Sequence, residues 1–147
     1  MARVSIELPS KFPFSTNISI RITDINYGGH GGNDTILSLI HEARMQFLLS
    51  AGYTEMNCGG SGLIMADAAI EFKKELFYGD VVTISVAALN FSKISFDLFY
   101  KLEKQAEGKP ILVVKAKTSM VCFDYTAKKI ANIPSEVKEK LTSMQKH

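Results

Sequence analysis

Alternating apolar and polar residues mark the first strand expected in this chain. Ile18, Ile20 and Ile22 occupy every second position of residues 17–24, so their side chains share one face of an extended segment. Four longer segments with apolar and β-branched residues follow, and Gly-, Asn- and Pro-containing turns separate them. These expected strands cover residues 62–73, 81–89, 94–103 and 111–123 and pair in antiparallel hairpins.

A long helix is expected between the first two strands, over residues 34–51. Its apolar residues cover most of its circumference, which is typical of a helix that other elements surround. Asn33 or Asp34 is expected to be its N-cap, and Gly52 is expected to end it in the left-handed conformation. A short second helix is expected from Ser135 to Met144.

This order of elements predicts an α+β fold. One helix cannot cover a flat sheet of about five long strands, so the sheet is expected to curve around it. A single domain is expected over residues 1–147, with an extended N-terminal arm over 1–15 and a C-terminal helix and tail over 135–147. The outer face or an edge of the sheet then needs cover, so a homodimer or homotetramer is expected.

Composition narrows the possible partners. Of the 147 residues, 46% are apolar and 22% are charged, as in ordinary soluble proteins, and a net charge of +2 is too small to indicate nucleic acid or an anionic membrane. We expect no membrane span and no secretory signal, because the chain lacks a long apolar run. Cys58 and Cys122 match no zinc or redox pattern, so reduced thiols in the cytoplasm are expected, and a disulfide between them stays open. No metal or cofactor is expected.

Candidate chemistry is concentrated between the first strand and the long helix, in the loop Asp24-Ile25-Asn26-Tyr27-Gly28-Gly29-His30-Gly31-Gly32-Asn33. Glycines allow backbone N–H groups to approach a ligand, and the helix N-terminus that follows favours an oxyanion. We therefore expect the N–H groups around Gly31, Gly32 and Asn33 to bind and polarise a carbonyl oxygen.

The loop resembles the motif D-x-D-x-x-G-H-x-N-N of the 4-hydroxybenzoyl-CoA thioesterase family. Glu42-Ala43-Arg44 is similar to the E-A-R on that family's helix, and Phe72 to Asp80 resembles its strand-to-turn segment ending in G-D. The resemblance covers residues 17–135. It implies a hot-dog fold, in which a curved sheet wraps a central helix, and hydrolysis of an acyl-CoA or acyl-carrier-protein thioester.

The chain departs from the motif at two positions. Asn26 stands where the family has its second acid, and Gly32 stands where it has the first of two Asn residues. An amide cannot take a proton from water, although it can hold water by hydrogen bonds. We therefore expect Asn26 and His30 to hold the water, and His30 or Asp24 to activate it. If residues 24–26 are extended, Asp24 and Asn26 share one face, so Asp24 could instead anchor Asn26.

The remaining residues allow alternatives. Tyr27 is expected to pack in the core, or else to line an acyl pocket, and Asn33 is expected to cap the helix or to lie close to the site. Lys73, Lys74 and Lys93 could meet CoA phosphates or be solvated.

Two other functions remain open. The order of Asp24, Asn26 and His30 also resembles the D-x-N-P-x-H motif of hot-dog enoyl-CoA hydratases, but the Pro is absent and His30 is one residue too far from Asn26. The amide at position 26 is also compatible with a protein that binds an acyl thioester without hydrolysing it.

Overall fold

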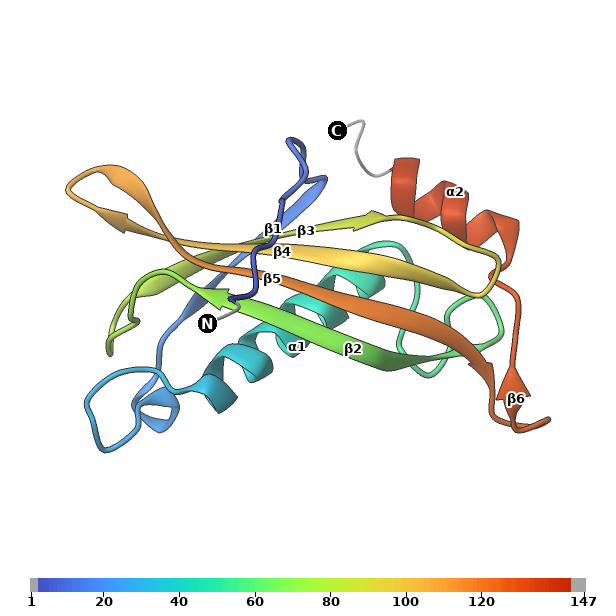
Figure 1. Cartoon of the computed structure of the whole chain (residues 1–147), viewed down its shortest axis with the longest axis horizontal. Coiled ribbons are helices and arrows are strands. Elements are labelled where there is room, and N and C mark those ends of the chain that lie inside the picture. The colour runs from blue at the N-terminus through green and yellow to red at the C-terminus, as the bar shows by residue number, and fades with distance from the viewer. Residues whose placement is uncertain (1–2, 144–147) are drawn as a thin grey trace.

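The computed structural model describes residues 3–143 and folds them into a curved antiparallel sheet with a long helix against its concave face (Figure 1). The strands are ordered β1-β3-β4-β5-β2 across the sheet, and β6 pairs with β5. The tail expected at 144–147 lies outside the described residues. In chain order the elements are β1 (Phe14–Ser19), a 3₁₀ turn (Ile22–Asp24), α1 (Asn33–Ser50), β2 (Gly62–Phe72), β3 (Val81–Leu89), β4 (Ser95–Ala106), β5 (Lys109–Asp124), β6 (Lys129–Ile130) and α2 (Ser135–Ser143).

β3, β4 and β5 confirm the two hairpins predicted between them, and β2 pairs with β5 at the edge of the sheet. The first predicted strand is wrong at its C-terminal end. β1 ends at Ser19, and residues 22–24 turn instead of extending. The carboxylate of Asp24 accepts the N–H of Arg21 at 2.8 Å, and this bond closes the turn. The hydrogen bond of the Asp24 side chain therefore determines the backbone conformation of this segment, and the alternation of Ile residues does not.

The two ends of α1 differ in how their backbone groups are satisfied. Its N-cap is Gly32, which has no side chain to cap with, so the prediction of Asn33 or Asp34 is wrong. At the other end Gly52 has a φ of +85°, as predicted. The N–H of Gly52 donates to the carbonyl of Leu49 at 2.9 Å, and that of Tyr53 donates to Leu48 at 2.8 Å. These two bonds form a Schellman motif.

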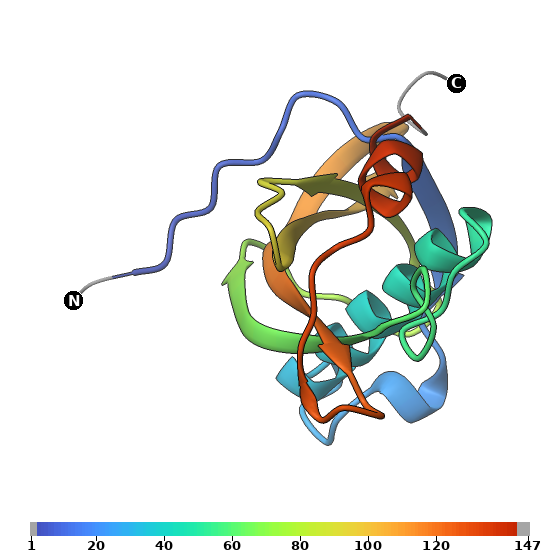
Figure 2. The same ribbon diagram turned by 90° about the vertical axis from the view of Figure 1, so that its right-hand side faces the viewer.

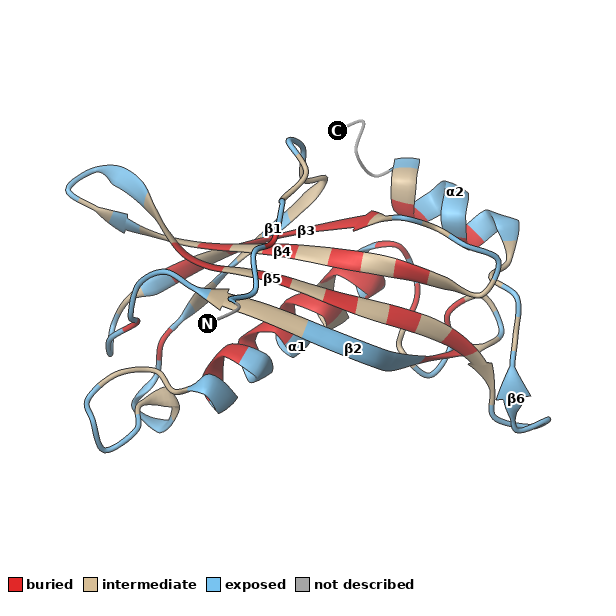
Figure 3. Cartoon of the chain, in the orientation of Figure 1, coloured by how far each residue is buried: buried red, intermediate tan, exposed pale blue. Residues whose placement is uncertain are grey.

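The core lies between the concave face of the sheet and α1. Buried residues alternate with half-buried ones along β4 and β5, as the red and tan bands of Figure 3 show. Figure 2 shows the sheet curling around one side of α1. Ile40, Ala43 and Phe47 face that side and are at most 1% exposed. From the C-terminal helix α2, Val137 and Leu141 join the same core.

One side of α1 stays open in a single copy of the chain. Leu37 and Leu49 are 45% and 58% exposed, so the prediction of a helix surrounded over most of its circumference is wrong for one copy. The neighbouring edge strand β2 is also open, and its residues 64–68 are all exposed (Figure 3). Helix and strand thus leave an uncovered apolar surface side by side.

The segment before β1 crosses the outer face of the sheet. The N–H of Ile6 donates to Glu71 Oε1 on β2 at 3.0 Å, and Lys115 Nζ on β5 donates to the carbonyl of Ile6 at 3.2 Å. Lys101 Nζ on β4 lies 5.0 Å from the centre of the Phe12 ring. Within residues 3–143, no helix is long and apolar enough to cross a bilayer.

Candidate active site

The loop that carries the predicted chemistry is closed by its own hydrogen bonds. Ile25 and Gly31 form an antiparallel bridge, and the N–H of Asn26 donates to the carbonyl of His30 at 3.0 Å. Inside the loop, Oδ1 of Asn26 accepts the N–H of Gly28 at 2.8 Å. The side-chain oxygen of Asn26 therefore already organises the turn.

Asp24 lies in the 3₁₀ turn rather than in a strand. The prediction that Asp24 and Asn26 share one face of a strand is therefore wrong. Its Oδ2 accepts the N–H of Arg21 at 2.8 Å, and its main-chain oxygen accepts the hydroxyl of Thr35 on α1 at 2.6 Å. The side chain borders a polar groove that contains Glu42, on a different part of the surface from His30. This geometry suits an anchor between the turn and α1.

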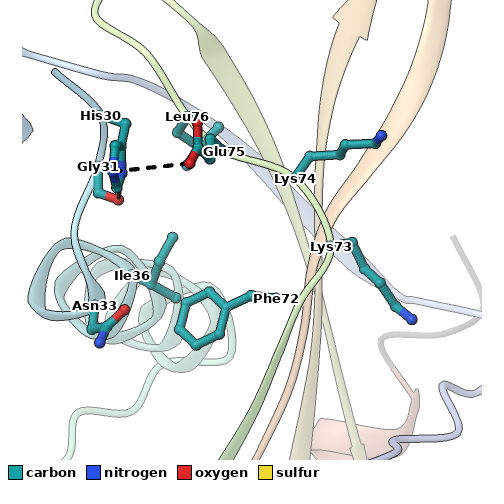
Figure 4. Close-up of a pocket in the computed structure, with 9 residues that line it drawn as sticks. All are labelled: His30, Gly31, Asn33, Ile36, Phe72, Lys73, Lys74, Glu75 and Leu76. Carbon is teal, nitrogen blue, oxygen red and sulfur yellow. Dashed lines mark hydrogen bonds and ion pairs between the residues drawn. The ribbon is translucent and has the colours of Figure 1, made fainter. Parts of the chain in front are cut away.

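A cavity of about 260 Å³ opens where the loop meets the connection between β2 and β3 (Figure 4). The two segments are joined by a backbone bond, in which the N–H of Gly31 donates to the carbonyl of Leu76 at 2.8 Å. The cavity wall combines apolar, cationic and acidic side chains with a ring nitrogen. The lining residues are His30, Gly31, Asn33, Ile36, Phe72, Lys73, Lys74, Glu75 and Leu76.

The imidazole of His30 is held between a carbonyl and a carboxylate. Nδ1 lies 3.2 Å from the carbonyl oxygen of Gly31, and Nε2 lies 3.9 Å from Glu75 Oε1 (Figure 4). Its side chain is 36% exposed, so water and ligand can reach it. A ring in this position can exchange protons with a molecule in the cavity.

The N-terminus of α1 leaves unbonded backbone donors at Asn33, which lines the cavity, and at the adjacent Gly32. Within residues 3–143, the N–H groups of Gly32 and Asn33 make no hydrogen bond. The N–H of Gly31 donates to the carbonyl of Leu76. It is therefore not free to bind a ligand, although we expected it to bind a carbonyl oxygen. A Cβ on Gly32 would lie 2.8 Å from Oδ1 of the exposed Asp34 side chain. The free donors at a helix N-terminus favour an anionic oxygen.

The structure brings together only some of the predicted site residues. Those that line the cavity are His30, Gly31 and Asn33, and those that do not are Asp24, Asn26, Tyr27 and Gly32. Tyr27 is fully exposed at 109%, so the prediction that it packs in the core is wrong. Its place in a glycine-rich turn at the surface directs its ring into solvent.

Sequence reasoning missed Phe72, Glu75 and Leu76 as parts of the site. The segment Phe72 to Asp80 stands out in the sequence only for its resemblance to a strand and turn. Its link to the loop depends on the bond between Gly31 and Leu76, which lie far apart in the sequence, and no local pattern predicts such a pairing. Lys73 and Lys74 line the cavity, whereas Lys93 does not.

A second polar cluster lies inside the molecule, under α1. The side chain of Arg44 is 7% exposed, and its Nε donates to Glu55 Oε1 at 3.0 Å. Its Nη1 donates to the hydroxyl of Tyr100 at 3.3 Å, and that hydroxyl lies 2.8 Å from the hydroxyl of Thr118. Burial raises the pKa of Tyr100, which keeps the phenol neutral. This network fixes α1 against β4 and β5.

The described residues form no cluster of side chains that could bind a metal ion. Within residues 3–143, no three His, Cys, Asp or Glu side chains are grouped as a metal site would need. Cys58 and Cys122 are free and buried.

Comparison with known proteins shows sequence similarity of the chain to esterases and acyl-CoA hydrolases. A putative esterase of Aquifex aeolicus is 30% identical over 131 residues, covering 88% of this chain and 98% of that protein. A 1,4-dihydroxy-2-naphthoyl-CoA hydrolase of Microcystis aeruginosa is 34% identical over 106 residues, covering 70% and 74%.

A solved thioesterase structure has a similar fold. The structure of 4-hydroxybenzoyl-CoA thioesterase from Pseudomonas sp. strain CBS-3 superposes with a TM-score of 0.76 at 17% identity, over 86% of this chain and 97% of that one. The chain therefore has the hot-dog fold that the motif implied. The sequence model of the Thioesterase-like superfamily matches residues 20–141. The protein with the closed glycine loop and the cavity beside His30 belongs to the Thioesterase-like superfamily.

Proposed function

We propose that this chain hydrolyses the thioester of an acyl-CoA to the free acid and the CoA thiol. The observation that carries the proposal is the cavity beside His30, where an apolar wall meets a titratable ring and free backbone donors. Membership in the superfamily supports the same reaction. So do the names of its relatives, a naphthoyl-CoA hydrolase and a hydroxybenzoyl-CoA thioesterase.

The walls of the cavity suit the two ends of a thioester. Ile36, Phe72 and Leu76 offer an apolar surface for the acyl group (Figure 4). The N–H groups of Gly32 and Asn33 are available to bind the carbonyl oxygen as it becomes an oxyanion. One such donor is worth about 10²- to 10³-fold in rate. His30 is the catalytic residue of this proposal, and Asn26 and Asp24 act as positioning residues.

Lys73 and Lys74 line the cavity, and their side chains extend away from His30, where they suit the phosphates of CoA (Figure 4). Lys73 Nζ is 2.6 Å from Glu71 Oε2, while Lys74 is exposed. We expect Lys74→Ala to raise KM for an acyl-CoA without lowering kcat. The same variant should hardly change KM for the matching acyl-pantetheine, which lacks the nucleotide phosphates. Lys93→Ala is the matched control, since Lys93 does not line the cavity.

Thiol release from a panel of acyl-CoAs tests the reaction directly. The panel contains aromatic and aliphatic acyl groups of several lengths, plus one acyl-carrier protein, and a thiol reagent reports the product. We expect turnover of at least one member, with loss of turnover in His30→Ala. Absence of thiol release above background for every member, at several pH values, would overturn the proposal. Tight binding of an acyl-CoA without turnover would instead support a binding protein.

We also propose that the working form is a homodimer or homotetramer in the cytoplasm. The open edge of β2 and the exposed Leu37 on α1 support a second copy at this surface, because an uncovered strand edge invites pairing. Two free, buried thiols, Cys58 and Cys122, suit a reducing compartment. The packing of α2 against the common core supports a single domain over residues 1–147.

A further inference from the structure

Among the residues that the structure describes, Glu75 is the only acidic one on the wall of the cavity beside His30. The carboxylate of Asp24 is bonded to Arg21 and borders another groove, and position 26 carries an amide whose oxygen is bonded to Gly28. A hydrolase that needs a carboxylate at this cavity therefore finds it on the β2–β3 connection and not in the glycine loop.

The contact of His30 Nδ1 with a carbonyl oxygen indicates which ring nitrogen can accept a proton. Nδ1 lies 3.2 Å from the carbonyl oxygen of Gly31, and a carbonyl can only accept, so we assign the proton of the neutral ring to Nδ1. Nε2 is then a free acceptor. It faces Glu75 Oε1, which is also an acceptor, across 3.9 Å.

Two acceptors at this separation can share one water molecule. A distance of 3.9 Å is too long for a direct hydrogen bond. A water about 2.8 Å from each atom can donate one hydrogen to Nε2 and the other to Oε1. Its lone pairs then point away from both acceptors. The arrangement activates the water while orienting it.

The backbone of Glu75 is fixed from two sides. Its carbonyl oxygen accepts Lys104 Nζ at 2.8 Å, and the next carbonyl, of Leu76, accepts the N–H of Gly31 at 2.8 Å. Lys104 Nζ is held in turn by Asp80 Oδ2 at 3.2 Å. The carboxylate is therefore presented to His30 by a segment bonded to the loop and to β4.

We propose that Glu75 supplies the carboxylate that position 26 lacks, and that Glu75 and His30 together hold and deprotonate the attacking water. This inference rests on the proposed thioester hydrolysis. The charged groups that share the cavity are Lys73 and Lys74, and Asp34 lies at the nearby helix N-terminus.

The step balances in atoms and charge. One proton of the water passes to Nε2 of His30 or to Oε1 of Glu75, and the water oxygen bonds to the thioester carbon. The carbonyl electrons move to oxygen, where the N–H groups of Gly32 and Asn33 meet the oxyanion. When the carbonyl re-forms, the C–S bond breaks, and the thiolate takes a proton from the same pair. The products are the free acid and the thiol.

Steady-state kinetics of Glu75→Gln test the proposal on an acyl-CoA that the wild-type protein hydrolyses. We expect kcat to fall about 100-fold, the lower end for loss of a general base, with KM within about twofold of wild type. Glu75→Asp should recover part of that loss, because it restores the charge. Glu107→Gln, at the exposed β4–β5 turn, is the matched control and should leave both constants unchanged.

A second pair of variants tests whether His30 and Glu75 share one water. In a His30→Gln background, adding Glu75→Gln should lower kcat far less than Glu75→Gln does alone, since the effects of groups that act as a unit are not additive. Thermal unfolding should show all variants folded, because Glu75 is 61% exposed. Wild-type kcat in Glu75→Gln, or full additivity in the double variant, would overturn the role of Glu75 while leaving hydrolysis intact. A wild-type protein that hydrolyses no thioester would overturn both.

Discussion

At the residue scale, Asn26 keeps the shape of the loop while lacking the charge that its family motif places there. Its Oδ1 accepts the N–H of Gly28 at 2.8 Å, and its main chain bonds that of His30. Both bonds are available equally to an aspartate. The loop geometry therefore does not depend on the chemistry of a base at position 26, and the position of His30 depends on the turn.

Two substitutions at Asn26 separate geometry from charge. Asn26→Ala loses the bond to Gly28, so we expect the free energy of unfolding to fall by about 1 kcal/mol. We also expect kcat to fall, because the turn no longer holds His30 in position. Asn26→Asp keeps an acceptor, so its kcat should stay within about threefold of wild type, which is less than about 1 kcal/mol. Urea denaturation and thiol-release assays measure both quantities. A large gain of activity in Asn26→Asp would show that the base belongs at position 26.

We expect the buried thiol of Cys58 to make the folded state less stable at alkaline pH. Burial, with Cys122 nearby, raises the pKa of Cys58 to about 12. A thiol in an unfolded chain titrates at about pH 8.5, so the unfolded state loses its proton first as the pH rises. The stabilisation from the neutral buried thiol is thus complete below about pH 8.5 and is lost between that pH and about pH 12.

Comparison with Cys58→Ala isolates this effect. Between about pH 9 and pH 10.5, the wild-type protein should lose about 1.4 kcal/mol of unfolding free energy per pH unit more than the variant. The variant is expected to be less stable at about pH 7 because of its small cavity, but that cost does not change with pH. Urea denaturation at several pH values provides the slopes. Parallel slopes for the two proteins would contradict a buried thiol with a raised pKa.

At the element scale, the C-terminus of α1 depends on one glycine. The φ of Gly52 is +85°, which places its N–H on Leu49 and allows that of Tyr53 to reach Leu48. An L-residue in this conformation brings its Cβ close to the backbone. The turn also directs the chain from α1 toward the loop that contains Cys58 and then to β2.

Gly52→Ala should therefore destabilise the protein even though the space beside Gly52 is open enough for a methyl group. A methyl carbon at this position would lie 3.5 Å from its nearest neighbour, Lys140 Nζ, so the cost comes from the backbone conformation. We expect a loss of about 1–2 kcal/mol in unfolding free energy by urea denaturation. Ser50→Ala, in the last turn of the same helix, should change stability by less than about 0.5 kcal/mol. Equal stability of Gly52→Ala and wild type would contradict this account.

The strands and helices could be predicted from periodicity because each pattern is local. β3 covers Val81–Leu89, the same residues as the predicted strand, and the turn around Glu107-Gly108 has positive φ at both residues. The first strand failed where a side chain, Asp24, made a bond that periodicity ignores.

The candidate site depended on contacts that no local pattern contains. The loop could be predicted from its glycines and the helix that follows, and His30 from the spacing of the motif that the loop resembles. Glu75 could not, since its place beside His30 follows from the pairing of Gly31 with Leu76 across the fold. The short β6 was missed because its two residues carry no period.

At the scale of the whole molecule, the open surface is formed jointly by α1 and β2. Leu37 and Met65 are 45% and 48% exposed and border the same hollow of about 270 Å³, together with His41 and Thr118. β2 is the last strand in the order of the sheet, so one row of its backbone groups has no strand partner among residues 3–143. Apolar side chains beside an unpaired edge favour association with another copy.

Sedimentation velocity of wild type and Met65→Glu tests whether this surface joins two copies. At about 10 µM, the wild-type protein should sediment with two or four times the chain mass of 16.2 kDa, and the fraction of assembled protein should rise with concentration. A carboxylate at position 65 would be buried without a partner in the assembly, so the variant should shift to the monomer. Met56→Glu is the matched control, because Met56 is 70% exposed and lies outside β2. A wild-type monomer at this concentration would contradict the assembly, and dissociation of Met56→Glu as well would place the contact on another surface.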